Sequence, residues 1–261
     1  MTESKVIGLI PAAGAASRLW HLPTSKELLP LGFMHHEEEG KARRIPKVIS
    51  HYLLDQFALA EIRQVIMILT REKLDILQYY DSGNKLGMDI GYVCVDKSIS
   101  MPHSIARAHA WHQDRTIAFG MPDTIFSPPD AVRKLFEFHR QQNADLSLGL
   151  FRTQEPWRFG MVEMDDAQQV IQCIDKPSET FLEWMWGIAC WEPTFSDMLL
   201  DRVASFEEVG KEEIVLGDIF QAAIEANLRV FGLPFDGGEY LDIGTSEAYE
   251  QAIVSLQRFD Q

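Results

Sequence analysis

The sequence predicts an α/β fold in a single domain over residues 1–261, with a central sheet flanked by helices. Two observations favour this class. Short apolar runs with the length of buried strands, such as Val6–Ile10 and Val65–Leu69, alternate with segments whose apolar residues recur at helical spacing. A chain of 261 residues that is 46% hydrophobic can also bury one substantial core.

The composition argues against some partners. The formal net charge is -15, which disfavours nucleic acids and anionic membrane surfaces, because both are bound mainly through basic side chains. We expect neither a signal peptide nor a membrane span, since no apolar run has the required length or position. Cys94, Cys173 and Cys190 lie far apart and form no CxxC, and so we expect reduced thiols in a cytoplasmic protein.

The most informative stretch runs from Val6 to Leu31. The first strand is followed by small residues that let the main chain approach a ligand closely, namely Ala12, Ala13, Gly14, Ala15, Ala16 and Ser17. Arg18 and Lys26 add two cations, and backbone N–H groups beside fixed cations suit a polyphosphate. The pattern is neither GxxxxGK(S/T) nor GxGxxG. Taken alone, it leaves open a polyphosphate site or an ordinary tight turn with solvated cations.

The later elements follow in chain order. Residues 33–44 are polar and charged, and we expect a surface loop insertion there. A helix is expected after Pro46, and the later segments are assigned by their apolar period. The expected strands are 65–69, 90–95, 116–119, 146–150, 158–163, 170–175 and 229–234, and the expected helices are 72–80, 131–141, 195–203, 218–226 and 246–261.

Two groups of histidines invite a metal-site interpretation, and we favour a simpler one for each. His35 and His36 are adjacent, so their side chains point in different directions, and a solvated loop fits them better. His103, His109 and His112 lack the spacing of a standard metal site. We therefore expect these three side chains on a helix surface.

Asp123 follows the expected strand Thr116–Phe119, after a Gly-Met-Pro connection. Open α/β sheets collect ligand-binding groups at the carboxyl ends of their strands, and this position therefore suits a ligand-binding carboxylate. The alternative is an aspartate that stabilises a turn or caps a helix.

The string AAGxxSRL followed by KELLPL resembles the signature of the sugar-1-phosphate nucleotidyltransferases, (A/G)GxGxRL followed by KxLLP. The resemblance implies a Rossmann-like fold of the nucleotide-diphospho-sugar transferase type with a mixed, mostly parallel central sheet. It also implies that Arg18 and Lys26 hold a triphosphate. The turn residues that would surround the nucleotide are Ala13, Gly14, Ala15 and Ser17. The chain departs from the signature at Ala16, which replaces a glycine, and in the gap from Arg18 to Lys26, which is shorter than in the thymidylyltransferase branch.

The segment with Pro102, Ala106 and Ala108 resembles the family's QxxxPxGxAxA, which holds the nucleotide base. Ile99 stands where the family has glutamine, and Ser104 stands where it has glycine. A glutamine amide pairs with a base edge, whereas Ile99 offers apolar contact only. We therefore expect looser selection of the base than in a dedicated thymidylyltransferase.

The string GGEYLDIGT resembles the family's WxDxGT, whose aspartate is a Mg²⁺ ligand, and Asp242 takes that position. The resemblance also matches Asp123 to the family's Gly-Asp strand end, with two residues inserted after Gly120. It thereby implies that Asp123 and Asp242 share one Mg²⁺ ion.

The string FGMVEMDDAQQVIQCIDKP resembles the family's FGVVxxDxxGxVxxxxEKP. It implies that Gly160 faces the sugar, that Asp175 replaces the usual glutamate on the sugar hydroxyls, and that Lys176 binds the sugar phosphate. Trp184–Trp191 matches the family's (T/A)GxYxF strand beside the sugar pocket. Its alternating tryptophans are core residues or, at Trp186, a stacking wall for the sugar.

Taken together, the resemblance implies Mg²⁺-dependent nucleotidyl transfer from a nucleoside triphosphate to a sugar 1-phosphate, such as glucose 1-phosphate, with release of pyrophosphate. The implied catalytic residues are Arg18, Lys26 and Lys176. Two alternatives stay open: transfer to a non-sugar phosphate such as phosphocholine, and a catalytically weak regulator that binds a nucleotide or sugar phosphate. The family also suggests a homo-oligomer, and the lack of hexapeptide repeats predicts no β-helix domain.

Overall fold

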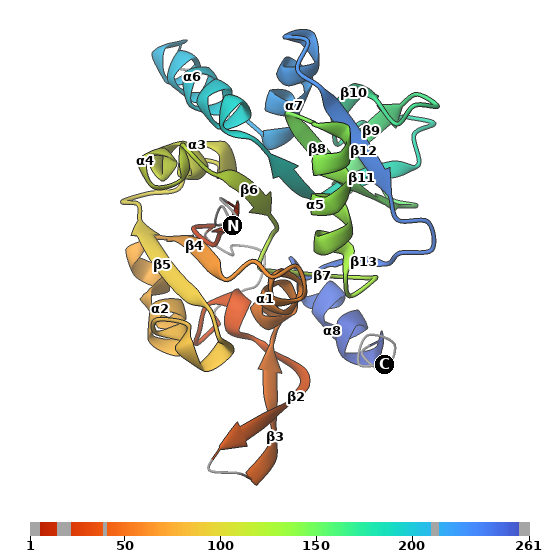
Figure 1. Ribbon diagram of the computed structural model, residues 1–261. Coiled ribbons are helices and arrows are strands. Elements are labelled where there is room, and N and C mark those ends of the chain that lie inside the picture. The colour runs from red at the N-terminus through yellow and green to blue at the C-terminus, as the bar shows by residue number, and fades with distance from the viewer. Residues whose placement is uncertain (1–5, 15–21, 39–40, 210–213, 256–261) are drawn as a thin grey trace.

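The computed structural model describes residues 6–14, 22–38, 41–209 and 214–255 (Figure 1). These residues form the strands β1 (Val6–Pro11), β2 (Pro30–Glu38), β3 (Lys41–Val48), β4 (Gln64–Leu69), β5 (Asp89–Cys94), β6 (Thr116–Phe119), β7 (Thr124–Phe126), β8 (Leu146–Arg152), β9 (Gly160–Met164), β10 (Val170–Asp175), β11 (Trp184–Trp191), β12 (Val230–Pro234) and β13 (Tyr240–Asp242). The α-helices are α1 (Ile49–Leu59), α2 (Leu74–Tyr80), α3 (Met101–Arg107), α4 (His109–His112), α5 (Ala131–Gln142), α6 (Pro193–Val209), α7 (Leu216–Glu225) and α8 (Ser246–Ser255). Short 3₁₀ helices are η1 (Lys26–Leu28), η2 (Arg71–Lys73), η3 (Asn84–Leu86) and η4 (Pro156–Arg158).

The central sheet is mixed, and the α/β class predicted from the sequence is confirmed. Its strands run in the order β10-β9-β11-β6-β1-β4-β5, and β8 and β12 join through β11. The strands β6, β1, β4 and β5 are parallel, whereas β11 pairs antiparallel with β6, β8 and β9. Because parallel strands end at the same edge, the connections after β1 and β6 open on one side of the sheet.

Strand β1 lies at the centre of the sheet, between β4 and β6. Its side chains enter two cores in alternation: Leu9 belongs to the cluster that includes α6 and α7, and Ile10 to the cluster that includes α1 and α5. Gly8 lets α1 approach closely, because a Cβ there would lie 2.8 Å from the Phe57 ring. Both faces of β1 are covered, which explains why the sequence shows an unbroken apolar run.

The loop predicted over residues 33–44 is wrong for residues 33–38 and 41–44. They belong to the antiparallel pair of β2 and β3, in which Phe33 lies opposite Pro46. Figure 1 shows the hairpin reaching away from the body of the molecule, below α1. The segment is mostly polar and so lacks the apolar pattern that indicates a buried strand. It can be polar because most of the hairpin is exposed rather than packed against the body. Met34 does contact the body, since its sulfur lies 3.0 Å from Nδ1 of His51 on α1.

The histidines of α3 and α4 are not all on a helix surface, and that prediction is wrong for two of the three. His103 and His112 are 7% and 1% exposed, because α6 packs against both short helices. His112 Nε2 lies 3.2 Å from the Ile105 carbonyl oxygen, and burial lowers the pKa of its imidazole. His109 is partly exposed and contacts Asp197 of α6.

Cys94, Cys173 and Cys190 are free thiols, as expected from their spacing. Burial raises the pKa of the Cys173 thiol to about 12, so this side chain is a neutral core residue. Among the described helices, none combines the length and the apolar character that crossing a membrane requires.

Candidate active site

Predicted residues from distant parts of the chain line one cavity of about 530 Å³. The cavity lies where β1, β6 and β10 end, and β9, β11 and β13 complete its wall. The predicted residues that it brings together are Ala13, Gly14, Lys26, Ile99, Ser104, Asp123, Gly160, Asp175, Lys176, Trp186 and Asp242. Ala15, Ser17 and Arg18 lie outside the described residues, and their contact with a triphosphate stays a prediction.

The turn after β1 forms one end of the cavity. The Ala12 N–H donates to the Ile68 carbonyl at 2.9 Å, which ties the turn to β4. Ala13 is buried, whereas Gly14 is exposed, and a Cβ on Gly14 would meet no atom of the described residues within 4 Å. The main chain at Gly14 therefore faces open space, as a ligand-binding turn requires.

Asp123, which directly precedes β7, and Asp242, at the end of β13, both line the cavity. β13 pairs antiparallel with β7, with Asp242 opposite Thr124, and the Ile243 N–H donates to the Asp123 carbonyl at 2.9 Å. Within the part of the chain that the structure describes, no cluster of three or more His, Cys, Asp or Glu side chains could hold a metal ion alone. Two carboxylates beside open space still fit Mg²⁺, since this ion keeps water or phosphate oxygens in its coordination shell.

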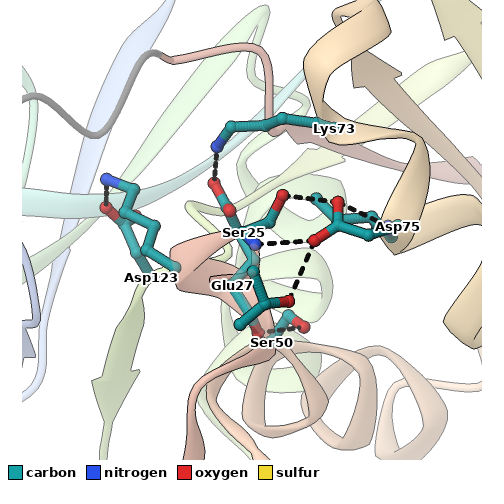
Figure 2. Close-up of polar contacts among 9 residues, drawn as sticks. Ser25, Glu27, Ser50, Lys73, Asp75 and Asp123 are labelled. Carbon is teal, nitrogen blue, oxygen red and sulfur yellow. Dashed lines mark hydrogen bonds and ion pairs between the residues drawn. The ribbon is translucent and has the colours of Figure 1, made fainter. Parts of the chain in front are cut away.

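Lys26 lies against this pair of carboxylates. Its ammonium group forms an ion pair with Asp123 (Figure 2), and the two side chains are 14% and 15% exposed. Burial lowers the pKa of Lys26, but the surrounding carboxylates, Asp123 above all, raise it above its ordinary value. The lysine therefore remains a cation in the cavity and can neutralise a phosphate group.

Asp175 and Lys176 lie where β10 ends. Lys176 has a φ of 44°, a left-handed conformation that non-glycine residues seldom adopt, and its N–H donates to the Phe159 carbonyl at 3.0 Å. Its side chain is 58% exposed, and its ammonium nitrogen lies 3.7 Å from Asp175. A strained residue at a cavity is typical of a functional position, because the surrounding structure must hold it there.

Gly160 lines the cavity, but the space beside its Cα is filled by Trp186. A Cβ on Gly160 would lie 2.2 Å from Nε1 of the indole. The indole is 8% exposed and packs edge-on against Phe220 at 5.1 Å, and its Nε1 has no hydrogen-bond partner among the described residues. Trp186 is therefore a core residue that also lines the cavity, and the stacking of a sugar on its indole stays a prediction.

The loop before α3 presents an apolar side chain to the cavity. Ile99 is 59% exposed there. Ser104 is buried, and its hydroxyl donates to the Ser100 carbonyl at 3.1 Å and lies 2.8 Å from the Ser98 hydroxyl. The Ser104 hydroxyl, on α3, is thus occupied by hydrogen bonds to the loop that precedes the helix. The contact of this loop with a base stays a prediction.

Sequence reasoning missed two charged side chains of the cavity, Arg158 and Glu27. The Arg158 guanidinium lies 3.9 Å from Asp242 and 2.7 Å from Glu155. Its place directly before the FGMV strand, beside a predicted ligand-facing glycine, is the signal that could have identified it. Glu27 is 2% exposed and pairs with Lys73, and burial raises the pKa of its carboxyl although Lys73 lowers it. Glu27 occupies the variable position of KxLLP, so the motif gives no reason to single it out.

A family model described as nucleotidyl transferase matches residues 7–258. The chain belongs to this family. The match extends from β1 into α8 and so includes the elements that line the cavity. The family predicted from the motif strings is therefore confirmed.

The chain resembles named proteins over nearly its whole length. It is 25% identical over 265 residues to the mannose-1-phosphate guanylyltransferase of Mycobacterium tuberculosis, and the alignment covers 99% of this chain and 66% of that protein. It is 21% identical over 254 residues to the glucose-1-phosphate thymidylyltransferase of Neisseria gonorrhoeae, covering 96% of this chain and 82% of that protein.

A solved structure shares the architecture. A Bacillus anthracis protein assigned as a glucose-1-phosphate thymidylyltransferase, crystallised with a sucrose, has a TM-score of 0.80 at 19% identity. The alignment covers 95% of this chain and 94% of that one. At this identity, the likeness establishes the nucleotidyl transferase fold.

The close contact between Gly160 and Trp186 can be tested by unfolding experiments. Gly160→Ala is expected to lower the free energy of unfolding by about 1–3 kcal/mol, because the added methyl group collides with the indole. Trp186→Leu removes the colliding atoms, so the double variant is expected to lose less stability than the two single variants combined. Urea titration of the four proteins measures this coupling.

Gly14→Ala is the matched control, since its added methyl group meets no atom within 4 Å in the part of the chain that the structure describes and should change stability little. Strictly additive losses for Gly160→Ala and Trp186→Leu would contradict the contact.

Proposed function

We propose that the protein transfers a nucleotidyl group from a nucleoside triphosphate to a sugar 1-phosphate, giving a nucleotide sugar and pyrophosphate. One observation carries the proposal: in a chain with a net charge of -15, Lys26 and Lys176 line the same cavity as a pair of aspartates. Such a cavity can receive two anionic substrates and a cation. Family membership and the activities for which the relatives are named support the same reaction.

The reaction forms one phosphorus–oxygen bond and breaks another. An oxygen of the sugar phosphate attacks the α-phosphorus of the triphosphate, and the bond to the bridging oxygen breaks, so that pyrophosphate leaves with the electron pair. Because the two substrates repel each other, the task of the protein is to neutralise and align them. In this proposal Lys26, together with Arg18, holds the triphosphate and stabilises the leaving pyrophosphate. Lys176 attracts the sugar phosphate.

Asp123 and Asp242 would hold one Mg²⁺ ion together with phosphate oxygens of the nucleotide. When bound, this ion neutralises phosphate charge and polarises the phosphoryl group that is transferred. The ion pair with Lys26 supports this use of Asp123, because the carboxylate already faces a cation there. Arg158, at 3.9 Å from Asp242, adds positive charge beside the same site.

The acceptor is proposed to be a hexose 1-phosphate such as glucose or mannose 1-phosphate. The relatives named for these sugars support this class. Asp175 can accept hydrogen bonds from sugar hydroxyls, and Trp186 supplies an apolar wall in the same cavity. A homo-oligomer and a cytoplasmic location stay predictions.

Pyrophosphate release across a grid of substrates tests the proposal. GTP, dTTP, UTP, CTP and ATP are each combined with glucose 1-phosphate, mannose 1-phosphate and phosphocholine in the presence of Mg²⁺. Turnover is expected with at least one sugar 1-phosphate. Because Ile99 provides apolar contact only, at least two triphosphates are expected to react with comparable kcat/KM. Turnover with phosphocholine alone would contradict the sugar assignment, and no turnover with any pair would contradict the reaction.

The variants Asp123→Asn and Asp242→Asn test the metal site. Each keeps the size of the side chain but removes the charge that balances the cation, and turnover is expected to fall roughly 100-fold or more. Circular dichroism checks that the fold is retained. Asp130→Asn is the control, because Asp130 pairs with two cations of α5 and does not line the cavity. Near-normal Mg²⁺-dependent turnover in a folded Asp242→Asn protein would exclude the proposed metal site.

Lysine variants separate the two anion sites. Lys26→Ala is expected to raise the KM for the triphosphate about 10-fold or more, and Lys176→Ala is expected to raise the KM for the sugar phosphate instead. Steady-state kinetics with each substrate varied in turn distinguishes the two effects. Lys134→Ala, which removes a cation outside the cavity, should change neither constant. If both variants affected only the triphosphate, the assignment of Lys176 would be wrong.

A further inference from the structure

Lys26 belongs to a short segment that is held by residues outside the cavity. The holding groups lie about fifty residues later in the chain, where η2 passes into α2. Figure 2 shows Lys73 and Asp75 from this region on one side of Ser25 and Glu27, and Asp123 on the other side. Neither Lys73 nor Asp75 lines the cavity.

The carboxylate of Asp75 accepts four hydrogen bonds. Its Oδ2 accepts from the Ser25 N–H at 2.6 Å and from the Thr24 hydroxyl at 2.9 Å. Its Oδ1 accepts from the Ser25 hydroxyl at 2.6 Å and from the Ile76 N–H at 3.0 Å. Partial burial raises the pKa of Asp75, but these hydrogen bonds lower it below its ordinary value, so the group is an ionised acceptor.

The residue that follows Lys26 is held as well. Glu27 forms an ion pair of 2.5 Å with Lys73, in which the side chains are 2% and 7% exposed. The Glu27 carbonyl also accepts a hydrogen bond of 2.8 Å from the Ser50 hydroxyl at the start of α1. Ser25 and Glu27, the chain neighbours of Lys26, are therefore held by hydrogen bonds and an ion pair to residues that do not line the cavity, whereas Lys26 itself does line it.

We propose that Asp75 is a positioning residue for the triphosphate, which acts through Ser25 to hold Lys26 where that substrate binds. The inference rests on the proposed function, in which Lys26 binds the triphosphate. A lysine whose main chain is already fixed loses less conformational freedom on binding, and a small displacement of an aligning group costs much of its effect. Only a carboxylate accepts on both oxygens, since the amide nitrogen of asparagine donates.

Triphosphate binding without an acceptor is the most direct test. Titration calorimetry with GTP and with dTTP, each in excess Mg²⁺, is applied to the wild type, Asp75→Asn, Lys26→Ala and the double variant. Asp75→Asn is expected to weaken binding about 10-fold, while the KM for the sugar phosphate stays within about twofold of wild type. Because Asp75 acts through Lys26, the same change is expected to have less than about a twofold effect in the Lys26→Ala background.

Asp145→Asn is the matched control. Asp145 is also a carboxylate that accepts from one backbone N–H and from side-chain groups, all of them on Arg229, and it does not line the cavity. Its variant should bind the triphosphates like wild type. If Asp75→Asn fails to fold, Thr24→Val and Ser25→Ala each remove one hydroxyl bond to the same carboxylate, and combining them is expected to weaken binding in the same Lys26-dependent way.

Two results would overturn the inference. One is wild-type affinity in a folded Asp75→Asn protein, and the other is equal weakening in the wild-type and Lys26→Ala backgrounds, which is the pattern of a general structural defect. Failure of the proposed function has a different pattern. In that case the wild type releases no pyrophosphate with any acceptor, or Lys26→Ala binds triphosphate as tightly as wild type does.

Discussion

An ion pair between Lys26 and Asp123 connects two segments of the cavity that are 97 residues apart in the chain. The lysine follows β1 and the aspartate follows β6, and these strands are parallel neighbours that end at the same edge. Both side chains are largely buried, and each offsets the cost of removing the other charge from water. The remaining charged groups of the cavity are arranged around this pair, with Asp242 and Arg158 on the side of β13 and η4.

Much of this arrangement could be predicted from the sequence because it depends on short strings at the ends of strands. The apolar run Val6–Ile10, interrupted only by Gly8, marks β1, and the strings around Lys26, Asp123 and Asp242 remain recognisable although the chain is only 25% and 21% identical to the two relatives compared above. Each string specifies which residues follow a strand. Parallel pairing then brings these strand ends together, so local information was enough to identify most of the charged side chains that line the cavity among the described residues.

The rest could not be predicted because it depends on contacts between distant segments. His112 is buried only because α6 packs against α4, and no pattern around the histidine contains that information. From the sequence, Asp75 is an ordinary acidic residue in the first turn of a helix, but in the structure its partners are the distant Thr24 and Ser25. Trp186 can adopt its position because Gly160, on another strand, has no side chain.

The cavity takes its lining from Pro11 near one end of the described chain to Asp242 near the other. Strand β1 reaches its central place only when β4 and β6 are present, and β13 completes the wall by pairing with β7 much later in the chain. Pairings of such large sequence separation form late compared with local helices and hairpins. A chain in which these pairings have not formed therefore lacks the complete cavity, and ligand binding there would report that its distant segments have come together.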